Sequence, residues 1–177
     1  MLYAFAFDRI GVVAGDLYFV NPDPAQDQEG PEQGVRLEVR LFDRGEPRGS
    51  IYAARPIVVD RPVWRADLLE SVANPGSLDR AHHHPRFQGW EPGARHFVEA
   101  MSADPLGWVE ARVRDLDGLL LEAGVAADDA GPDDARDLRA AAPQILDAVR
   151  RLLGGVRGGD LARAPATAGD SVRSGWL

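Results

Sequence analysis

The clearest pattern in the chain is the strict alternation of apolar and charged residues over residues 35–41. Side chains at every second position of an extended chain point to the same face. One face therefore carries aliphatic residues and the other carries charged residues, namely Val35, Leu37, Val39 and Leu41 against Arg36, Glu38 and Arg40. This period of two predicts a half-buried antiparallel strand.

Shorter apolar runs in the first half of the chain predict further strands. These strands are expected at residues 3–7, 10–14, 17–20, 50–54 and 57–60, with Gly15-Asp16 as a hairpin turn. Residues 21–33 are acidic and rich in Gln and Pro, which predicts a flexible loop. Residues 64–69 are compatible with either a strand or a short helix.

The second half has the spacing of amphipathic helices. Asp104-Pro105 predicts an N-cap followed by proline at the first helical position. Apolar residues then recur at intervals of 3 or 4 up to a stop at Gly124, namely Leu106, Val109, Val113, Leu116 and Leu120. A second helix is expected after Pro132, with a kink or a break at Pro143.

Strands in the first half and helices in the second half predict an α+β fold. We expect an N-terminal antiparallel sheet of about four to six strands packed against two or three C-terminal helices. A length of 177 residues fits one domain, which we place at residues 1–153. Residues 154–177 are rich in Gly, Ala and Arg without periodicity, so we interpret them as a tail with Trp176 as a docking point.

Composition excludes several classes of function. The chain has neither Cys nor Lys, which excludes disulfides, thiolate nucleophiles and Schiff bases, and it has no phosphate-loop motif for a nucleotide. A formal net charge of −8 argues against nucleic acid as a partner. No apolar run is long enough to span a membrane, and the N-terminus lacks the features of a signal peptide, so we expect a cytoplasmic protein. The bias toward Arg, Ala, Gly and Pro is typical of a bacterial genome rich in G and C.

The charge is unevenly distributed along the chain. Residues 55–96 contain six arginines and five acidic residues, whereas the remainder contains 14 arginines and 23 acidic residues. This nearly neutral segment also holds all four histidines. Within it, residues 74–93 lack periodicity, and loops of that length inside a compact domain are uncommon and are often functional. We therefore place the candidate site in residues 64–96.

Two of the histidines have the spacing of metal ligands. His82 and His84 are two positions apart, so both imidazoles of an extended chain point to one face and can bind one ion. A carboxylate or a further imidazole would complete the set, with Glu91 as the working choice beside Asp67, Asp79 and His96. Such ligands suit zinc or non-haem iron.

The spacing of Gly76, five residues and then His82-His83-His84 resembles the opening of the cupin motif. In that motif a glutamate follows the histidines after three or four residues. Here the nearest glutamate is Glu91, with six residues between it and His84, and no second motif follows. We therefore do not assign the chain to this family.

Acid–base chemistry is the other interpretation of the segment. Histidine titrates near neutrality, so His82, His84 or His96 paired with Asp79 would act as a general acid or base. Arginine forks hold carboxylates or phosphates in bidentate fashion. We expect three arginines to bind an anionic ligand and two tryptophans to wall its pocket, namely Arg80, Arg86 and Arg95 with Trp64 and Trp90.

Two hypotheses of different class follow. In the first, residues 64–96 bind a small anionic molecule, with or without a divalent metal; the sequence does not distinguish an enzyme from a binding protein. In the second, the chain is a non-catalytic interaction module of immunity, accessory or regulatory type that uses the same segment and the tail. Arg and Trp are favoured at interfaces, and an edge of the N-terminal sheet would support a homodimer.

Overall fold

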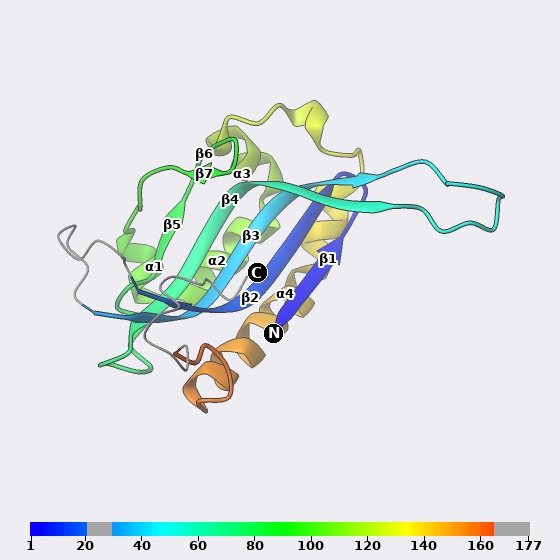
Figure 1. Ribbon diagram of the computed structural model, residues 1–177. Coiled ribbons are helices and arrows are strands. Elements are labelled where there is room, and N and C mark those ends of the chain that lie inside the picture. Colours follow the sequence, from blue (N-terminus) through cyan, green and yellow to red (C-terminus); the bar gives the residue numbers. More distant parts are fainter. Residues whose placement is uncertain (21–29, 165–177) are drawn as a thin grey trace.

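A computed structural model describes residues 1–20 and 30–164 of the chain. Five strands form one antiparallel sheet in the order β1-β2-β3-β4-β5, and they span Leu2–Ala6, Ile10–Phe19, Glu32–Arg44, Ile57–Ser71 and His82–His84. A separate hairpin follows, formed by β6 (Phe87–Gln88) and β7 (Glu91–Pro92). The helical half comprises α1 (Glu99–Ala103), α2 (Pro105–Arg114), α3 (Leu116–Ala123), a 3-10 turn (Ala127–Asp129) and α4 (Asp134–Arg157). The helices pack on one face of the sheet (Figure 1), which confirms the predicted α+β fold.

The strands depart from the predicted pattern in three places. β2 runs straight through Gly15-Asp16, so the predicted hairpin turn is wrong; β1 and β3 pair with β2 on both sides and hold this stretch extended. The predicted strand at residues 50–54 is wrong as well, because these residues form turns. Residues 64–69 belong to β4, and His82–His84 form an edge strand where an irregular loop was predicted.

The helices show how local signals act. Asp104 accepts the Gly107 N–H at 3.0 Å and caps α2, as predicted. Asp115 caps α3 in the same way, so the single predicted helix is two helices divided at Asp115. Gly124 ends α3 in the left-handed conformation that favours glycine, with a φ of 70°.

α4 continues through Pro143, so of the predicted kink or break the break is wrong. Proline lacks an N–H, which frees the carbonyl of Arg139 four residues earlier. The Arg114 guanidinium of α2 donates to that carbonyl at 3.5 Å, so a neighbouring helix supplies the missing partner. α4 ends at Arg157, beyond the predicted domain boundary at 153, and Trp176 lies outside the described residues.

The core lies between the sheet and the helices. Alternate residues of β2, β3 and β4 point toward α2, α3 and α4, and Val35, Leu37, Val39, Trp64 and Leu68 are fully buried there. The intervening residues therefore point to the opposite face of the sheet. That face carries the charged side chains of β3 and β4, which sets the position of the candidate site.

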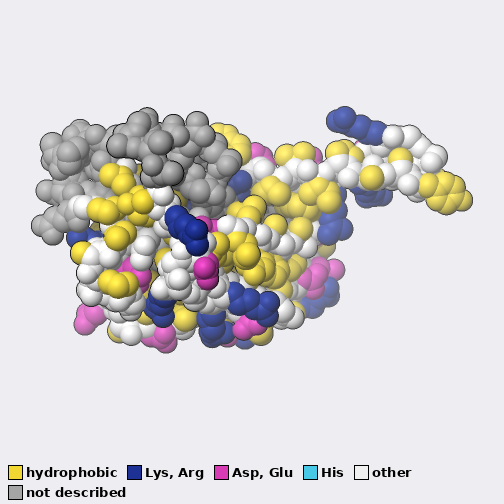
Figure 2. All heavy atoms as spheres, turned by 60° about the horizontal axis from the view of Figure 1, so that its bottom comes forward, with side chains coloured by type: hydrophobic (Ala, Val, Ile, Leu, Met, Phe, Trp, Pro, Cys, Tyr) yellow, Lys and Arg dark blue, Asp and Glu magenta, His cyan; other side chains and the backbone are white. Residues whose placement is uncertain are grey.

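β3 and β4 also extend beyond the body of the sheet. Their register shifts at Val39/Arg40 and again at Arg40/Phe42, opposite Pro62, and such bulges bend a strand. From this point residues 43–60, here called the arm, project away from the body (Figures 1 and 2).

Candidate functional site

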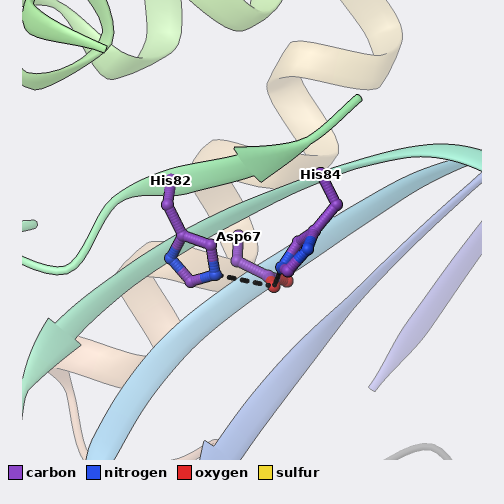
Figure 3. Close-up of side chains that lie close together, drawn as sticks. All are labelled: Asp67, His82 and His84. Carbon is purple, nitrogen blue, oxygen red and sulfur yellow. Dashed lines mark ion pairs between the residues drawn. The ribbon is translucent and has the colours of Figure 1, made fainter. Parts of the chain in front are cut away.

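The register of three neighbouring strands brings the site together. Asp67 of β4 lies opposite His82 of β5 on one side and opposite Arg36 of β3 on the other. Two pairs along, Arg65 lies opposite His84. Because the residues alternate, all five side chains lie on the face of the sheet that the helices leave free. His82 and His84 point from β5 toward the Asp67 carboxylate (Figure 3).

Backbone carbonyls fix the tautomers of both histidines. His82 Nδ1 lies 2.7 Å from the Arg80 carbonyl, and His84 Nδ1 lies 2.7 Å from the Gly93 carbonyl. A carbonyl only accepts, so each Nδ1 carries a proton. In the neutral rings both Nε2 atoms therefore present lone pairs. They lie 3.3 Å (His82) and 3.6 Å (His84) from Oδ2 of Asp67.

The two lone pairs have different surroundings. Arg65 Nη2 donates to His84 Nε2 at 2.8 Å, and burial is the main cause that lowers the pKa of His84, so this ring is neutral at neutral pH. His82 is 1% exposed, and its Nε2 makes no aligned hydrogen bond with any described residue. A buried polar atom without a hydrogen-bond partner is costly, so this nitrogen is a candidate ligand atom.

Asp67 is the charged centre of the cluster. Its side chain is 1% exposed. Arg36 Nε donates to Oδ1 at 2.7 Å, and Arg65 Nε lies 3.0 Å from Oδ2. Burial by itself would raise the pKa of Asp67, but the guanidiniums of Arg36 and Arg65 oppose burial and hold it well below its usual range. The carboxylate is therefore ionised at neutral pH.

Residues after β5 fold back over this charged face. Trp90 lies over the Arg40 guanidinium, with 5.5 Å from the Arg40 Cζ to the ring centroid. The Phe87 ring centroid lies 5.9 Å from the Arg65 Cζ in the same way. Glu38 is only 5% exposed, and burial raises its pKa. The strand predicted to be half-buried is thus buried on both of its faces near the site.

A cavity of about 410 Å³ opens beside the cluster. Its polar lining consists of Asp67, His84 and three arginines, namely Arg36, Arg65 and Arg95. Its apolar lining comes from β2, β4 and β7, namely Leu17, Phe19, Leu69 and Pro92. Arg95 pairs with the buried Glu32 at 3.3 Å. Arginines in such numbers around one small cavity suit a carboxylate or a phosphate.

The other predicted site residues lie elsewhere. His96 and Arg86 line a second cavity, and the His96 backbone pairs with that of His83. Asp79 is bound by Ser71 and Ser77 in a turn; these hydrogen bonds outweigh burial and lower its pKa.

The two tryptophans do not wall the 410 Å³ cavity. Trp64 is fully buried on the helix side against Trp108, with 6.0 Å between ring centroids. Trp90 is 61% exposed. Glu91, the working choice for a third metal ligand, is exposed on β7 and is not part of the Asp67–His82–His84 cluster. Arg80 contributes its carbonyl to His82.

The central residues Arg36 and Arg65 were not predicted as site residues, and Asp67 was one of several options. A signal for them does exist in the chain. Arg65 and Asp67 are two positions apart, as are His82 and His84, so each pair shares one face of its strand. Recognising this would have required knowing that β4 and β5 are neighbours.

No protein-family model matches the chain, and no curated protein or solved structure matches it either. Among the described residues, no helix is both long enough and apolar enough to cross a membrane. Because no known protein matches, the geometry of the site is the basis for a proposed function.

Proposed function

We propose that the protein binds a divalent metal ion through Asp67, His82 and His84, together with a small anionic molecule in the adjoining cavity. One carboxylate oxygen and two imidazole nitrogens, all within 4.8 Å of one another, form a 2-His-1-carboxylate set. This set suits non-haem iron or zinc and leaves coordination positions open. When bound, the ion would supply Lewis acidity beside the arginine-lined cavity.

The observation that carries this proposal is the fixing of both histidines by backbone carbonyls. Metal-binding histidines usually donate their other ring N–H to a carbonyl or a carboxylate, which orients the lone pair toward the metal. His82 and His84 both have this arrangement. Ligands about 2.1 Å from one ion lie about 3.4 Å apart in tetrahedral geometry, close to the 3.3 and 3.6 Å that separate each Nε2 from the Asp67 carboxylate.

The charge balance explains why an anion belongs to the same proposal. On this face Arg36, Arg40 and Arg65 already outnumber the carboxylates of Glu38 and Asp67. A dication here would leave a large positive excess in a buried region, which is unfavourable unless a further anion enters. On metal binding, Arg65 would release His84 Nε2 and turn to the anion, and Arg95 at the cavity wall would bind it as well.

Metal content is the direct test. Protein purified without a histidine tag is expected to bind one Zn²⁺ or Fe²⁺ per chain by calorimetry and by elemental analysis after desalting. His82→Ala and His84→Ala should each abolish this binding. The matched control is His96→Ala, which removes an exposed histidine outside the cluster and should bind metal normally. Failure of the wild-type chain to bind either ion overturns the metal part of the proposal.

The anion is tested separately on the Zn²⁺-loaded protein with inorganic phosphate and with oxalate as probes. Arg95→Ala should weaken binding of the preferred probe at least tenfold while leaving the metal content unchanged. Arg86→Ala, which alters an arginine of the second cavity, is the control. Equal affinity in wild type and Arg95→Ala would count against anion binding at this cavity.

The pairing of Asp67 with two guanidiniums favours one alternative. Because the carboxylate is already compensated, His82 and Asp67 at 3.3 Å would form an acid–base pair without a metal, facing the same anion. This alternative predicts that phosphate or oxalate binds the metal-free protein as tightly as the Zn²⁺-loaded protein. A strict requirement for Zn²⁺ would exclude it.

A further inference from the structure

The arm exposes more large apolar side chains than any comparable stretch of the described chain. Ile51 and Tyr52 at its end are each 90% exposed. Behind them three consecutive β-branched residues of β4 are also exposed, namely Ile57 at 66%, Val58 at 49% and Val59 at 38%. Clustered exposed apolar residues usually mark an interaction surface.

Beyond Arg44, whose guanidinium donates to the Phe7 carbonyl at the base of the arm, the arm stands away from its own body (Figure 1). It projects from the sheet as a two-stranded ribbon with apolar side chains along it (Figures 1 and 2). Asp43 pairs with Val58 and Arg44 with Ile57, and the Gly45 N–H donates to the Pro56 carbonyl; residues 46–55 beyond these pairs are turns and irregular chain. An isolated hairpin of this kind is marginal in water, so a partner that covers it would stabilise it.

The end of the arm is basic, whereas the helical segment is strongly acidic. The arm as a whole (residues 43–60) has three arginines and three acidic residues, but its end (residues 45–56) carries Arg48 and Arg55 with a single acid, Glu46. Residues 99–137, which cover α1 to the start of α4, contain 11 acidic residues and three arginines, a net charge of −8 that equals the charge of the whole chain. Arg48 and Arg55 form no ion pair with any described residue, so they are available to an acidic surface.

The acidic segment borders a cavity that the arm of another molecule could enter. The second cavity has a volume of about 490 Å³ and lies between the β6–β7 hairpin and Glu122 of α3. Pro85, Phe87 and Ala94 give it an apolar lining, and Arg86, Gln88 and His96 offer polar groups to a phenol hydroxyl. Next to Glu122, Leu121 is 81% exposed, so apolar and acidic groups occur together at this place.

We propose that the arm of one copy docks on a second copy of this chain, with Tyr52 and Ile51 in the cavity beside α3 and with Arg48 and Arg55 against its acidic helices. Both surfaces are present on every copy, so two molecules related by a two-fold axis can exchange arms and close a dimer. Tyr is favoured at the centre of interfaces because it combines a large apolar ring with a polar end.

The absence of cysteine from the chain allows a specific test. A Tyr52→Cys variant is mixed with an Ala94→Cys variant under mild oxidation, and a disulfide-linked dimer that contains one chain of each is expected. The control replaces Ala94→Cys by Asp147→Cys, which places the thiol on the exposed side of α4. Equal cross-linking in both mixtures, or none in the first, would overturn the proposal.

Light scattering over a range of concentrations tests the same contact without cross-links. Wild type is expected to approach twice the mass of the 19.2-kDa chain, and the Ile51→Ser/Tyr52→Ser double variant should dimerise at least tenfold more weakly. Arg48→Glu/Arg55→Glu should do the same and should remove the salt dependence. Val72→Ser, which alters an exposed apolar residue outside the arm, is the control.

The outcomes separate this contact from other kinds of assembly. A wild-type chain that remains monomeric at all concentrations overturns the proposal. So does a dimer that the arm variants leave intact while substitutions at Leu2 on the β1 edge break it, because that result would assign the contact to sheet pairing. Since neither Tyr52 nor Ala94 touches the Asp67 cluster, the metal content of the arm variants shows independently whether that site is intact.

Discussion

β3 and β4 pair along most of their length, yet their two ends distribute side chains in opposite ways. In the body they bury charged residues, with Asp67 at 1% and Glu38 at 5% exposure. In the arm they expose Ile57 and Val58 to solvent. Buried charges are expensive unless they are paired, and exposed apolar residues are unfavourable unless something covers them. Both ends therefore depart from what stability alone favours, and the proposed metal and anion at one end and the proposed dimer contact at the other would each account for the departure.

The largest expected effect comes from removing the buried carboxylate. Asp67→Ala leaves Arg36 and Arg65 in a buried site without their counter-charge, and breaking a buried pair in this way costs about 3–5 kcal/mol. Chemical denaturation measures the change. Asp147→Ala breaks an exposed pair with Arg151 and should cost less than about 0.5 kcal/mol. Similar losses for the two variants would show that the buried pairs of Asp67 contribute no more to stability than an exposed pair.

The next largest effect is the pH dependence of the free energy of unfolding, which comes from His83 in the body of the sheet. Burial, followed by Arg112 and the neighbouring histidines, lowers the pKa of His83 from 6.5 to about 4. Between these values the unfolded chain binds a proton that the folded chain does not. The free energy of unfolding therefore falls as the pH drops from 6.5 to 4, by up to about 3 kcal/mol.

His83→Leu should flatten the slope of stability against pH in this window, as measured by denaturation at several pH values. Protonation of Asp67 acts in a different window, because the pKa of Asp67 is lowered and its contribution is lost only as the pH falls below 4. An unchanged slope between pH 6.5 and 4 in His83→Leu would contradict the assignment to His83.

Binding of a metal at Asp67, His82 and His84 should raise the free energy of unfolding by an amount comparable to or smaller than the pH effect of His83. At a free Zn²⁺ concentration 100 times the dissociation constant, linkage gives about 2.7 kcal/mol. Thermal unfolding with and without Zn²⁺ measures the shift. His82→Ala should lose it and His96→Ala should keep it; an equal shift in both variants would indicate binding elsewhere.

The smallest effect is expected in the arm. Tyr52→Ser alters a side chain that is 90% exposed, so the monomer should change by less than about 0.5 kcal/mol. Denaturation at a protein concentration low enough to prevent association measures this value. A loss of more than 1 kcal/mol under these conditions would mean that the arm packs on its own body, and the contrast between the two ends would disappear.

Local signals fixed much of the fold from sequence. Asp104 and Gly124 were predictable as helix boundaries because a cap and a left-handed glycine depend only on nearby backbone groups. The alternation at residues 35–41 correctly separated the two faces of β3. The same period of two placed His82 and His84 on one side of their strand, and this is the part of the candidate site that the sequence determined by itself.

Tertiary structure decided what those faces meet. β2 stays extended through Gly15-Asp16 because β1 and β3 pair with it, which outweighs the preference of these residues for a turn. Asp67 meets His82 because β4 and β5 are neighbours in register, a relation between residues 15 positions apart that no local pattern encodes. The charged face of β3 is buried because residues 85–97 return across it, and only that long-range contact turns an ordinary amphipathic strand into the wall of a site.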